Sequence, residues 1–217
     1  MAKSASAKAL DAVQARLAKL LALHGFVRGG RTFRRDAGEG VVQVVTLQMR
    51  AFADGAPGGI MAPVDRFTVN LGIFIPELRP ETPTPGAPVQ EYDCALRARM
   101  GDLLDPPHDR WWDLPGDAAE VGAEIVRVME ARGLPFLRRF ATRDAVVAEW
   151  IQFSDAHGLA ATARTDVATL LAGRGQPREA RALLQALRCR DGMAASAVAW
   201  LDALAARLGL EPLEACT

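Results

Sequence analysis

Two apolar stretches, Val41–Met49 (VVQVVTLQM) and Arg66–Ile75 (RFTVNLGIFI), decide the fold. Both are rich in β-branched residues, which are typical of strands. In the second stretch, apolar residues at every other position alternate with a more mixed set, so we expect one face of the strand to pack against helices. The apolar set is Phe67, Val69, Leu71, Ile73 and Ile75, and the opposite set is Thr68, Asn70, Gly72 and Phe74.

The segments around these strands predict an antiparallel meander. Residues 31–35 alternate as a short strand, and Asp36–Gly40 (DAGEG) is typical of a hairpin turn that leads directly into Val41. A Gly/Pro-rich stretch, 54–63, separates the two long strands. The segment 76–88 contains five prolines, which predict a loop because proline lacks a backbone donor. Residues 92–104 alternate like a strand although their composition also suits a helix, and we expect a strand.

Amphipathic helices flank this sheet. Apolar residues spaced by three and four positions predict a helix that begins near Ser4 or Ser6 and ends at Gly25. A second helix is expected over 117–132, with Gly133 as its stop. A third is expected from Pro135 to about residue 153, with a break near Thr142.

The remaining chain is predicted to be helical, with segments that start near Thr162, Pro177 and Met193. One stretch (TLLAGRGQPREARALLQAL) resembles the turn and second helix of a tetratricopeptide-type repeat, but it has no second copy, so we expect a helical hairpin. The predicted fold class is therefore α+β: an antiparallel meander packed by an N-terminal helix and following helices, plus an all-helical extension. We place the α+β domain at 1–154 and the extension at 155–217.

Composition describes an ordinary globular chain. Its 217 residues are 50% hydrophobic, and 26 Lys+Arg balance 26 Asp+Glu, which excludes a mainly disordered state. No apolar run is long enough to span a membrane, and residues 1–10 lack the pattern of a signal peptide, so we expect a cytoplasmic protein. Three cysteines without a C-x-x-C pair suit reduced thiols better than a disulfide framework.

Several function classes receive no support from motifs. Arg28–Arg31 (RGGR) follows a helix and lacks the features of a phosphate-binding loop. His24, His108 and His157 are scattered, so we expect neither a metal site nor a cofactor. No G-x-S-x-G nucleophile turn occurs. Net neutrality and the absence of an RNP-type motif argue against sequence-specific nucleic-acid recognition.

The candidates for proton transfer are Asp105 and His108, which lie between Asp102 and Asp109. Carboxylates this close together can hold a cation or separate their pKa values. The alternative is ordinary turn chemistry, because Asp before Pro is common in turns.

The candidates for ligand binding are Gln48, Asn70, Arg97 and Arg99, polar residues within strand-like segments. We expect them to share the polar sheet face with Gln43, Thr68, Arg34 and Arg50. Arginine presents a fork that matches carboxylate or phosphate, so this face could read an anion. The alternative is a solvated sheet face. The neighbouring Trp111–Trp112 pair predicts one ring in the core and one outside it, because successive strand residues point to opposite faces.

The order of these features resembles one known family. The chain reads GFVRGGRTF, then VVQVVTLQ, RFTVNLG, CALRAR, a Trp-Trp pair and LPFL, and over about residues 10–150 this is similar to the bacterial domain-of-unknown-function family numbered 4304. The resemblance implies a compact α+β domain and no established activity. Its pattern falls on these positions: Gly25, Phe26, Thr32, Phe33, Gln48, Asn70, Gly72, Arg97, Arg99, Trp111 and Trp112.

We therefore expect a non-catalytic protein-binding module in which the sheet face or the C-terminal helices hold a protein partner. Some bacterial antidotes to toxins are proteins of this general type. The alternative is an enzyme or binding protein for an anionic small molecule that uses the Arg-rich sheet face. In that alternative, Gln48, Asn70, Arg97 and Arg99 bind the molecule and Asp105 or His108 transfers a proton. A concave pocket that joins these groups would favour the alternative, and a flat, exposed sheet face would favour the module. Self-association through the sheet edge or the last helices remains open.

Overall fold

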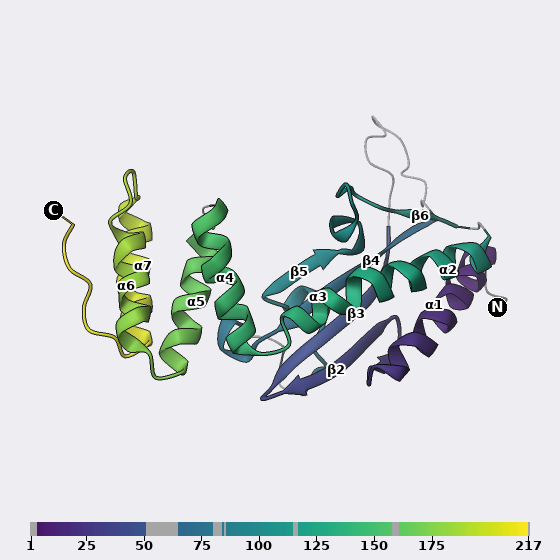
Figure 1. Cartoon of the computed structure of the whole chain (residues 1–217), viewed down its shortest axis with the longest axis horizontal. Coiled ribbons are helices and arrows are strands. Elements are labelled where there is room, and N and C mark those ends of the chain that lie inside the picture. Colours follow the sequence, from purple (N-terminus) through teal and green to yellow (C-terminus); the bar gives the residue numbers. More distant parts are fainter. Residues whose placement is uncertain are drawn as a thin grey trace. The chain divides into compact units, whose positions relative to one another are not determined.

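The computed structural model describes residues 4–50, 65–79, 84, 86–114, 117–157 and 161–216, with backbone only over 151–157 and 161–163. The chain forms two compact units, Met1–Ala141 and Thr142–Thr217, which are described separately (Figure 1). The boundary between the units, after Ala141, lies thirteen positions before the one predicted between residues 154 and 155. The reason is that the helix after Thr142 packs with the C-terminal helices. The predicted loop over 54–63 lies outside the described residues, as does part of the proline-rich segment.

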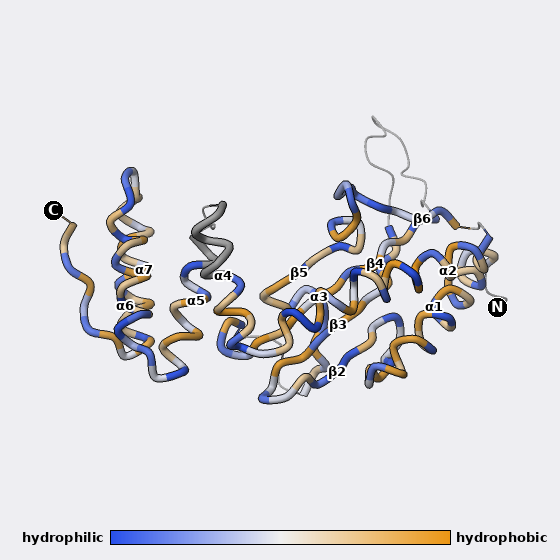
Figure 2. Tube along the Cα trace, viewed as in Figure 1, coloured by the Kyte–Doolittle hydropathy of each residue, from blue (hydrophilic) through white to orange (hydrophobic). Residues whose placement is uncertain are grey.

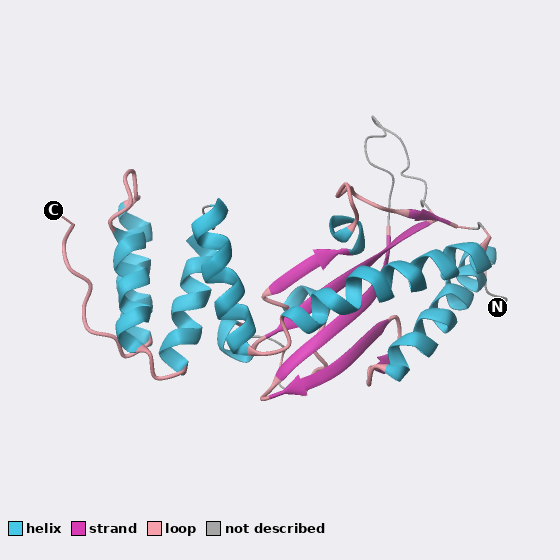
Figure 3. Cartoon of the chain, in the orientation of Figure 1, coloured by secondary structure: helices cyan, strands magenta, loops and turns pink. Residues whose placement is uncertain are grey.

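Unit 1 is built on an antiparallel sheet of six strands (Figure 3). The order β1-β2-β3-β4-β5 follows the chain. β6 pairs with the first two residues of β4, Arg66 and Phe67, whereas β5 pairs with residues 70–73 of the same strand. The meander and the α+β class are as predicted, and β1 is a short strand that sequence analysis missed. The strands are Val27–Gly29, Thr32–Gly38, Val41–Met49, Arg66–Phe74, Leu96–Arg99 and Trp112–Asp113, numbered β1 to β6.

Strand register separates the sheet into two faces. On the helix-covered face, Phe33 lies opposite Val45, which lies opposite Leu71, and all three are buried. Phe67, Val69, Leu71 and Ile73 lie on that face and are fully buried, as predicted. The opposite set, Thr68, Asn70, Gly72 and Phe74, is buried too, so β4 is covered on both faces. The hydropathy colouring shows hydrophobic residues along β3, β4 and the covering helices (Figure 2).

Three helices cover this face (Figure 1). Helix α1 (Ala5–Leu23) begins after Ser4, whose hydroxyl accepts from the Ala7 amide at 3.2 Å, and it ends just before Gly25 in the left-handed conformation (φ 78°). Helix α2 (Ala118–Val128) packs on α1 and continues through a π-helical turn, Met129–Gly133, into α3 (Leu134–Arg139). The chain therefore carries one bent helical rod over the sheet.

The prediction that Gly133 stops a helix is wrong. Gly133 has right-handed helical angles (φ −66°), and a Cβ there would lie 2.4 Å from Met129 Sδ and 3.3 Å from Leu71 Cδ2. The residue lacks a side chain because the rod approaches β4 closely at this point. The break predicted near Thr142 is confirmed, since α3 ends at Arg139 and α4 begins at Arg143.

A buried polar chain ties the sheet to α3. Gln43 is fully buried, and its amide nitrogen donates to the Leu137 carbonyl at 2.6 Å. That carbonyl lies in the last turn of α3, where intrahelical donors run out. Arg35 donates through Nε to Gln43 Oε1 at 3.0 Å and through Nη1 to the His24 carbonyl at 3.1 Å, at the end of α1. Two helix ends and two strands thus share one hydrogen-bonded chain.

The segment 92–104 is only partly the strand we expected. It consists of a 3₁₀ turn at Glu91–Asp93, the four residues of β5, and a second 3₁₀ turn at Met100–Leu103. Asp93 and Asp102 each accept a backbone hydrogen bond three residues back, from Gln90 at 2.7 Å and from Arg99 at 2.8 Å. These local carboxylate caps favour tight turns over a longer strand.

Unit 2 contains α4 (Arg143–His157), α5 (Ala161–Gly173), α6 (Pro177–Arg188) and α7 (Ala195–Arg207), each packed on the next in chain order (Figure 3). The segment after α7 runs back along α6, and Cys189 forms a disulfide with Cys216. The expectation of reduced thiols is therefore wrong for this pair, because the return of the chain brings together two cysteines separated by 27 positions. Cys94 is free and buried.

Candidate functional site

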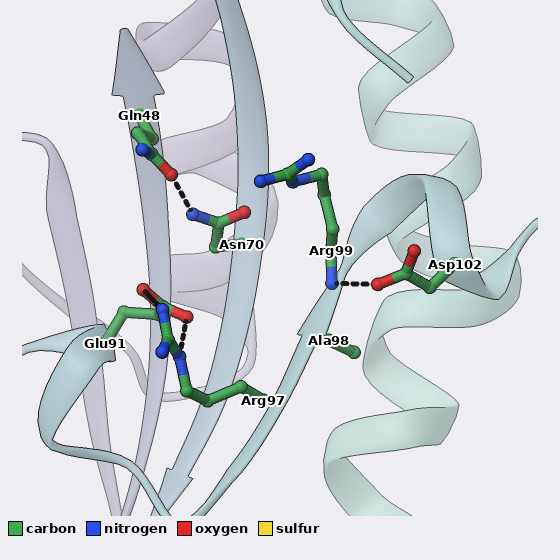
Figure 4. A pocket seen from close by; sticks show the side chains of 7 residues that line it. All are labelled: Gln48, Asn70, Glu91, Arg97, Ala98, Arg99 and Asp102. Carbon is green, nitrogen blue, oxygen red and sulfur yellow. Dashed lines mark hydrogen bonds and ion pairs between the residues drawn. The ribbon is translucent and has the colours of Figure 1, made fainter. Parts of the chain in front are cut away.

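The sheet face opposite the helices carries a polar pocket of about 320 Å³ (Figure 4). The predicted ligand-binding residues Gln48, Asn70, Arg97 and Arg99 all line this pocket. Glu91, Ala98 and Asp102 complete the lining. The structure therefore brings together four residues that lie up to 51 positions apart in the sequence.

Strand pairing places these side chains. Asn70 on β4 pairs with Arg99 on β5, and Gly72 pairs with Arg97. Partners in register point to the same face, so both arginines project beside the centre of β4. A Cβ on Gly72 would lie 2.6 Å from Cys94 Sγ and 2.8 Å from Cys94 Cβ. The missing side chain lets the Glu91–Cys94 segment approach the sheet and form one wall of the pocket.

The Gln48–Asn70 pair supplies amide groups to the pocket. Asn70 is nearly buried, and its Nδ2 donates to Gln48 Oε1 at 2.5 Å, while Gln48 itself is exposed. A side-chain amide offers two donors and an acceptor with two lone pairs. One bond between the two amides leaves each able to bind a further polar group.

Arg97 and Glu91 form a bidentate ion pair at the wall of the pocket. Arg97 donates from Nε to Glu91 Oε1 at 2.6 Å and from Nη2 to Oε2 at 3.0 Å. The hydrogen bonds to Glu91 raise the pKa of the Arg97 guanidinium above its usual value. Glu91 is nearly buried whereas Arg97 is about half exposed, so the carboxylate is held in the wall and the guanidinium faces the opening.

Arg99 is held by a different set of contacts. It donates through Nη1 to Asp109, and its guanidinium carbon lies 5.1 Å from the centre of the Trp111 ring. Arg50 lies over the same ring, at 5.4 Å. Trp111 Nε1 donates to Asp109 Oδ2 at 2.9 Å, and this bond, followed by the bond from Arg99, lowers the pKa of Asp109. Two arginines, an indole and a carboxylate thus form a polar rim beside the pocket.

The two tryptophans separate as predicted. Trp111 is partly exposed and belongs to this rim, whereas Trp112 is 2% exposed and stacks on Phe67 at 5.7 Å between ring centres. The start of β6 therefore anchors the rim to the core through neighbouring residues.

One residue assigned to the polar face by sequence lies elsewhere. Gln43 pairs with Ile73 and points to the helix-covered face, so it takes no part in the pocket. Gln43 and Gln48 are five positions apart, an odd number, and a strand places such residues on opposite faces. Thr68 and Arg34 lie on the predicted face but do not line the pocket, and Arg50, just after β3, lies over the Trp111 ring in the rim.

Asp105 and His108, the proton-transfer candidates, are exposed and are not among the pocket-lining residues. The ring Nδ1 of His108 lies 3.0 Å from the Pro106 carbonyl oxygen, a local turn contact. Asp102 caps the turn at residue 99, and Asp109 belongs to the rim. Of the four neighbouring groups, the pocket therefore includes Asp102 alone.

Sequence reasoning missed Glu91, the carboxylate that binds Arg97. The residue lies between the proline-rich loop and β5, where the sequence shows no regular period. Its separation of six positions from Arg97 corresponds to neither helix nor strand neighbours, so no local pattern pairs them. Glu91 is the first residue of a short 3₁₀ turn, and its carboxylate is held by Arg97.

Two further properties concern other ligands. Among the residues that the structure describes, no three His, Cys, Asp or Glu side chains gather closely enough to hold a metal ion. Within the same residues, no helix combines the length and the apolar character needed to cross a bilayer.

A family comparison bears on the part of the chain that contains the pocket. Residues 17–139 match the family model "Domain of unknown function (DUF4304)", which is more than half of the chain. The chain belongs to this family. The DUF4304 match extends from within α1 to the end of α3, so it includes every pocket residue and the Trp111 rim.

Unit 2 lies outside the DUF4304 match. No curated protein and no solved structure matches the chain.

Proposed function

We propose that unit 1 binds a small polar molecule with an anionic group in the sheet pocket. The observation that supports this is the convergence of Gln48, Asn70, Arg97 and Arg99 on one concavity, which favours the small-molecule alternative over a flat docking face. The anionic group would contact the exposed edges of the two guanidinium groups.

The two carboxylates of the pocket, Glu91 and Asp102, limit which anions can bind there. Glu91 and Asp102 balance the formal charges of Arg97 and Arg99, so a multiply charged anion would face two acidic groups. A ligand that also carries a cationic or donor group would satisfy both signs. We therefore propose a zwitterion of amino-acid size or a polar monocarboxylate as the ligand class.

We propose binding without catalysis at this site. Both carboxylates already accept hydrogen bonds within the protein, Glu91 from Arg97 and Asp102 from the Arg99 amide. A general base must instead reach the proton of a bound substrate.

The test is a ligand-observed NMR screen of the full chain against amino acids, monocarboxylates and phosphate monoesters. We expect a zwitterion or monocarboxylate to bind, and Arg99→Gln or Gln48→Ala to weaken its binding at least tenfold. The control is Arg66→Gln, because Arg66 is also an exposed, ion-paired arginine on the sheet but lies outside the pocket. No binding at millimolar ligand, or equal weakening in the control variant, would contradict the proposal.

We propose a second role, protein binding, for unit 2. Trp200 on α7 is 53% exposed, although a large aromatic side chain gains from burial and is enriched at interfaces. Helices packed in chain order also present an extended surface. This role corresponds to the binding module expected from the sequence, for which the sheet face and the C-terminal helices are the two candidate surfaces, and we assign it to the helices. A cytoplasmic location and self-association remain predictions of the sequence.

The protein-binding role is tested by capture from host lysate with the tagged full chain. We expect a stoichiometric polypeptide that is lost from Trp200→Ser. The matched control is Tyr92→Ser, which removes an exposed aromatic from unit 1. Capture that survives Trp200→Ser would refute the placement of the interface on α7.

A further inference from the structure

The segment 210–216, here called the strap, lies along one face of α6. Three α6 residues spaced by four and three positions contact it: Arg181, Gln185 and Arg188. This spacing places them on one helix face, while Ala180, Leu184 and Leu187 face the interior of unit 2. The contact face is therefore a row of long polar side chains with the strap across it.

Most hydrogen bonds from α6 to the strap go to its backbone groups. Gln185 donates through Nε2 to the Glu214 carbonyl at 3.0 Å and accepts through Oε1 from the Glu214 amide at 2.8 Å. Arg181 Nη2 donates to the Pro212 carbonyl at 2.8 Å, and Arg188 Nη1 donates to the Glu214 carbonyl at 2.9 Å. Backbone groups are common to all peptides, so this face can hold other extended segments.

One strap side chain is also recognised. The Glu214 carboxylate lies 3.0 Å from Arg181 Nη2. Arg188 is oriented by Asp202 of α7, which accepts from its Nε at 2.9 Å. The face therefore favours an acidic residue at one defined position of an extended peptide.

A covalent bond holds the strap in place. Cys216 at its end is joined to Cys189, which directly follows α6, and both residues are exposed. Leu210, 8% exposed, is buried at the other end. The strap is thus fixed at both ends while its middle is held by hydrogen bonds.

We propose that the α6 face is a docking site for an extended acidic segment of a partner protein, and that the disulfide-bonded strap occupies it until the disulfide is reduced. The inference rests on the protein-binding role proposed for unit 2 and specifies the partner's chemistry. Charge complementarity supports the choice of occupant, because α6 presents arginines and the strap presents Glu211 and Glu214.

Release requires a dithiol reductant, such as a protein with a redox-active C-x-x-C pair. One thiolate of the reductant attacks a sulfur of the Cys189–Cys216 bond, and its second thiol then resolves the mixed disulfide. Two electrons and two protons pass to the protein, which gains two thiols, and the reductant becomes a disulfide. Without the covalent bond, the strap still competes with a partner segment for the α6 face, because its attachment to α7 keeps its local concentration high.

Disulfide trapping on the full chain tests this inference. The Cys216→Ser variant leaves Cys189 exposed as an attachment point, while burial raises the pKa of the Cys94 thiol to about 12 and keeps it unreactive. Two peptides, LEPLEAC and LEPLKAC, compete for Cys189 under a mild thiol buffer, and intact mass spectrometry measures the captured ratio. We expect a three- to tenfold preference for LEPLEAC, about the effect of reversing one exposed charge.

A third peptide, LEPLEAC N-methylated at the second Glu, lacks the donor to Gln185. We expect its capture to fall in Cys216→Ser and to equal that of the parent peptide when Gln185→Ala is added. The control is Gln176→Ala, an exposed glutamine at the N-cap of α6, five positions before Arg181, the first of the three residues that bond to the strap. Equal capture of all three peptides would overturn the inference. If Trp200-dependent partner capture persisted in that case, the docking face alone would be wrong and the protein-binding role of unit 2 would stand.

Discussion

Replacement of Gln43 by methionine tests whether one buried amide connects the sheet to two helix ends. The change keeps the length of the side chain but removes the donor to the Leu137 carbonyl and the acceptor of Arg35. An unsatisfied buried carbonyl costs about 1–3 kcal/mol, and loss of the bond to the half-buried Arg35 costs about 1 kcal/mol because water reaches it. We expect a loss of about 2–4 kcal/mol in the free energy of unfolding.

The assay is urea unfolding of the full chain followed by tryptophan fluorescence and circular dichroism. With a slope of about 2 kcal/mol per molar urea, the midpoint should fall by about 1–2 M. The matched control is Gln48→Met on the same strand. Because the Gln48 side chain is exposed, we expect loss of its amide to lower the free energy of unfolding by under about 1 kcal/mol. Gln43→Glu should destabilise more than Gln43→Met at neutral pH, since a carboxylate oxygen would face the Leu137 carbonyl. Equal midpoints for the Gln43 and Gln48 variants would refute the reasoning.

Three other predictions concern the pocket and its surroundings. Gly72→Ala should destabilise unit 1 by about 1–3 kcal/mol in urea unfolding, because its Cβ would overlap Cys94; Cys94→Gly should recover part of that loss, and no recovery would place the clash elsewhere. Cys94 should resist iodoacetamide at pH 8 in the folded chain and react after unfolding, since burial raises its pKa to about 12; mass spectrometry reads the label. Asp109 should titrate below the usual range of an aspartate by carboxyl ¹³C NMR, and Trp111→Phe should raise its pKa, because the indole donor contributes most to the lowering, ahead of Arg99. Its contribution to stability should be present above the unfolded-state pKa and disappear as pH falls through the folded-state pKa.

The central strands and the first helix could be predicted because their residues alternate or recur locally. Val41–Met49 and Arg66–Phe74 are strands as expected, and α1 ends just before Gly25. The position of Gln43 was also within reach, since its odd separation from Gln48 assigns it to the other face. Polarity alone places Gln43 on the wrong face, because the face of a strand residue is decided by its parity along the strand.

Other features depend on contacts that no local pattern contains. Gly133 looks like a helix stop, and only the proximity of Leu71 shows that it is a point of close approach. Glu91 reaches Arg97 through a 3₁₀ turn, and Cys189 meets Cys216 because the strap returns along α6. To predict any of these features, one must know which distant segments lie side by side in the fold. The periodicity of a single sequence does not contain that information.

The two margins of the sheet have a consequence for association with other chains. At one margin, β1 has three residues; at the other, the outer side of β4 is divided between the four residues of β5 and the two of β6. An incoming strand is stabilised by each backbone hydrogen bond that it forms with an edge strand. Outer strands this short can form only a few such bonds with it. The fold thereby protects its longest and most apolar strands, β3 and β4, from strand addition and the aggregation that follows from it. Under crowding or partial heating, we expect unit 1 to remain dispersed for as long as these short outer strands stay paired.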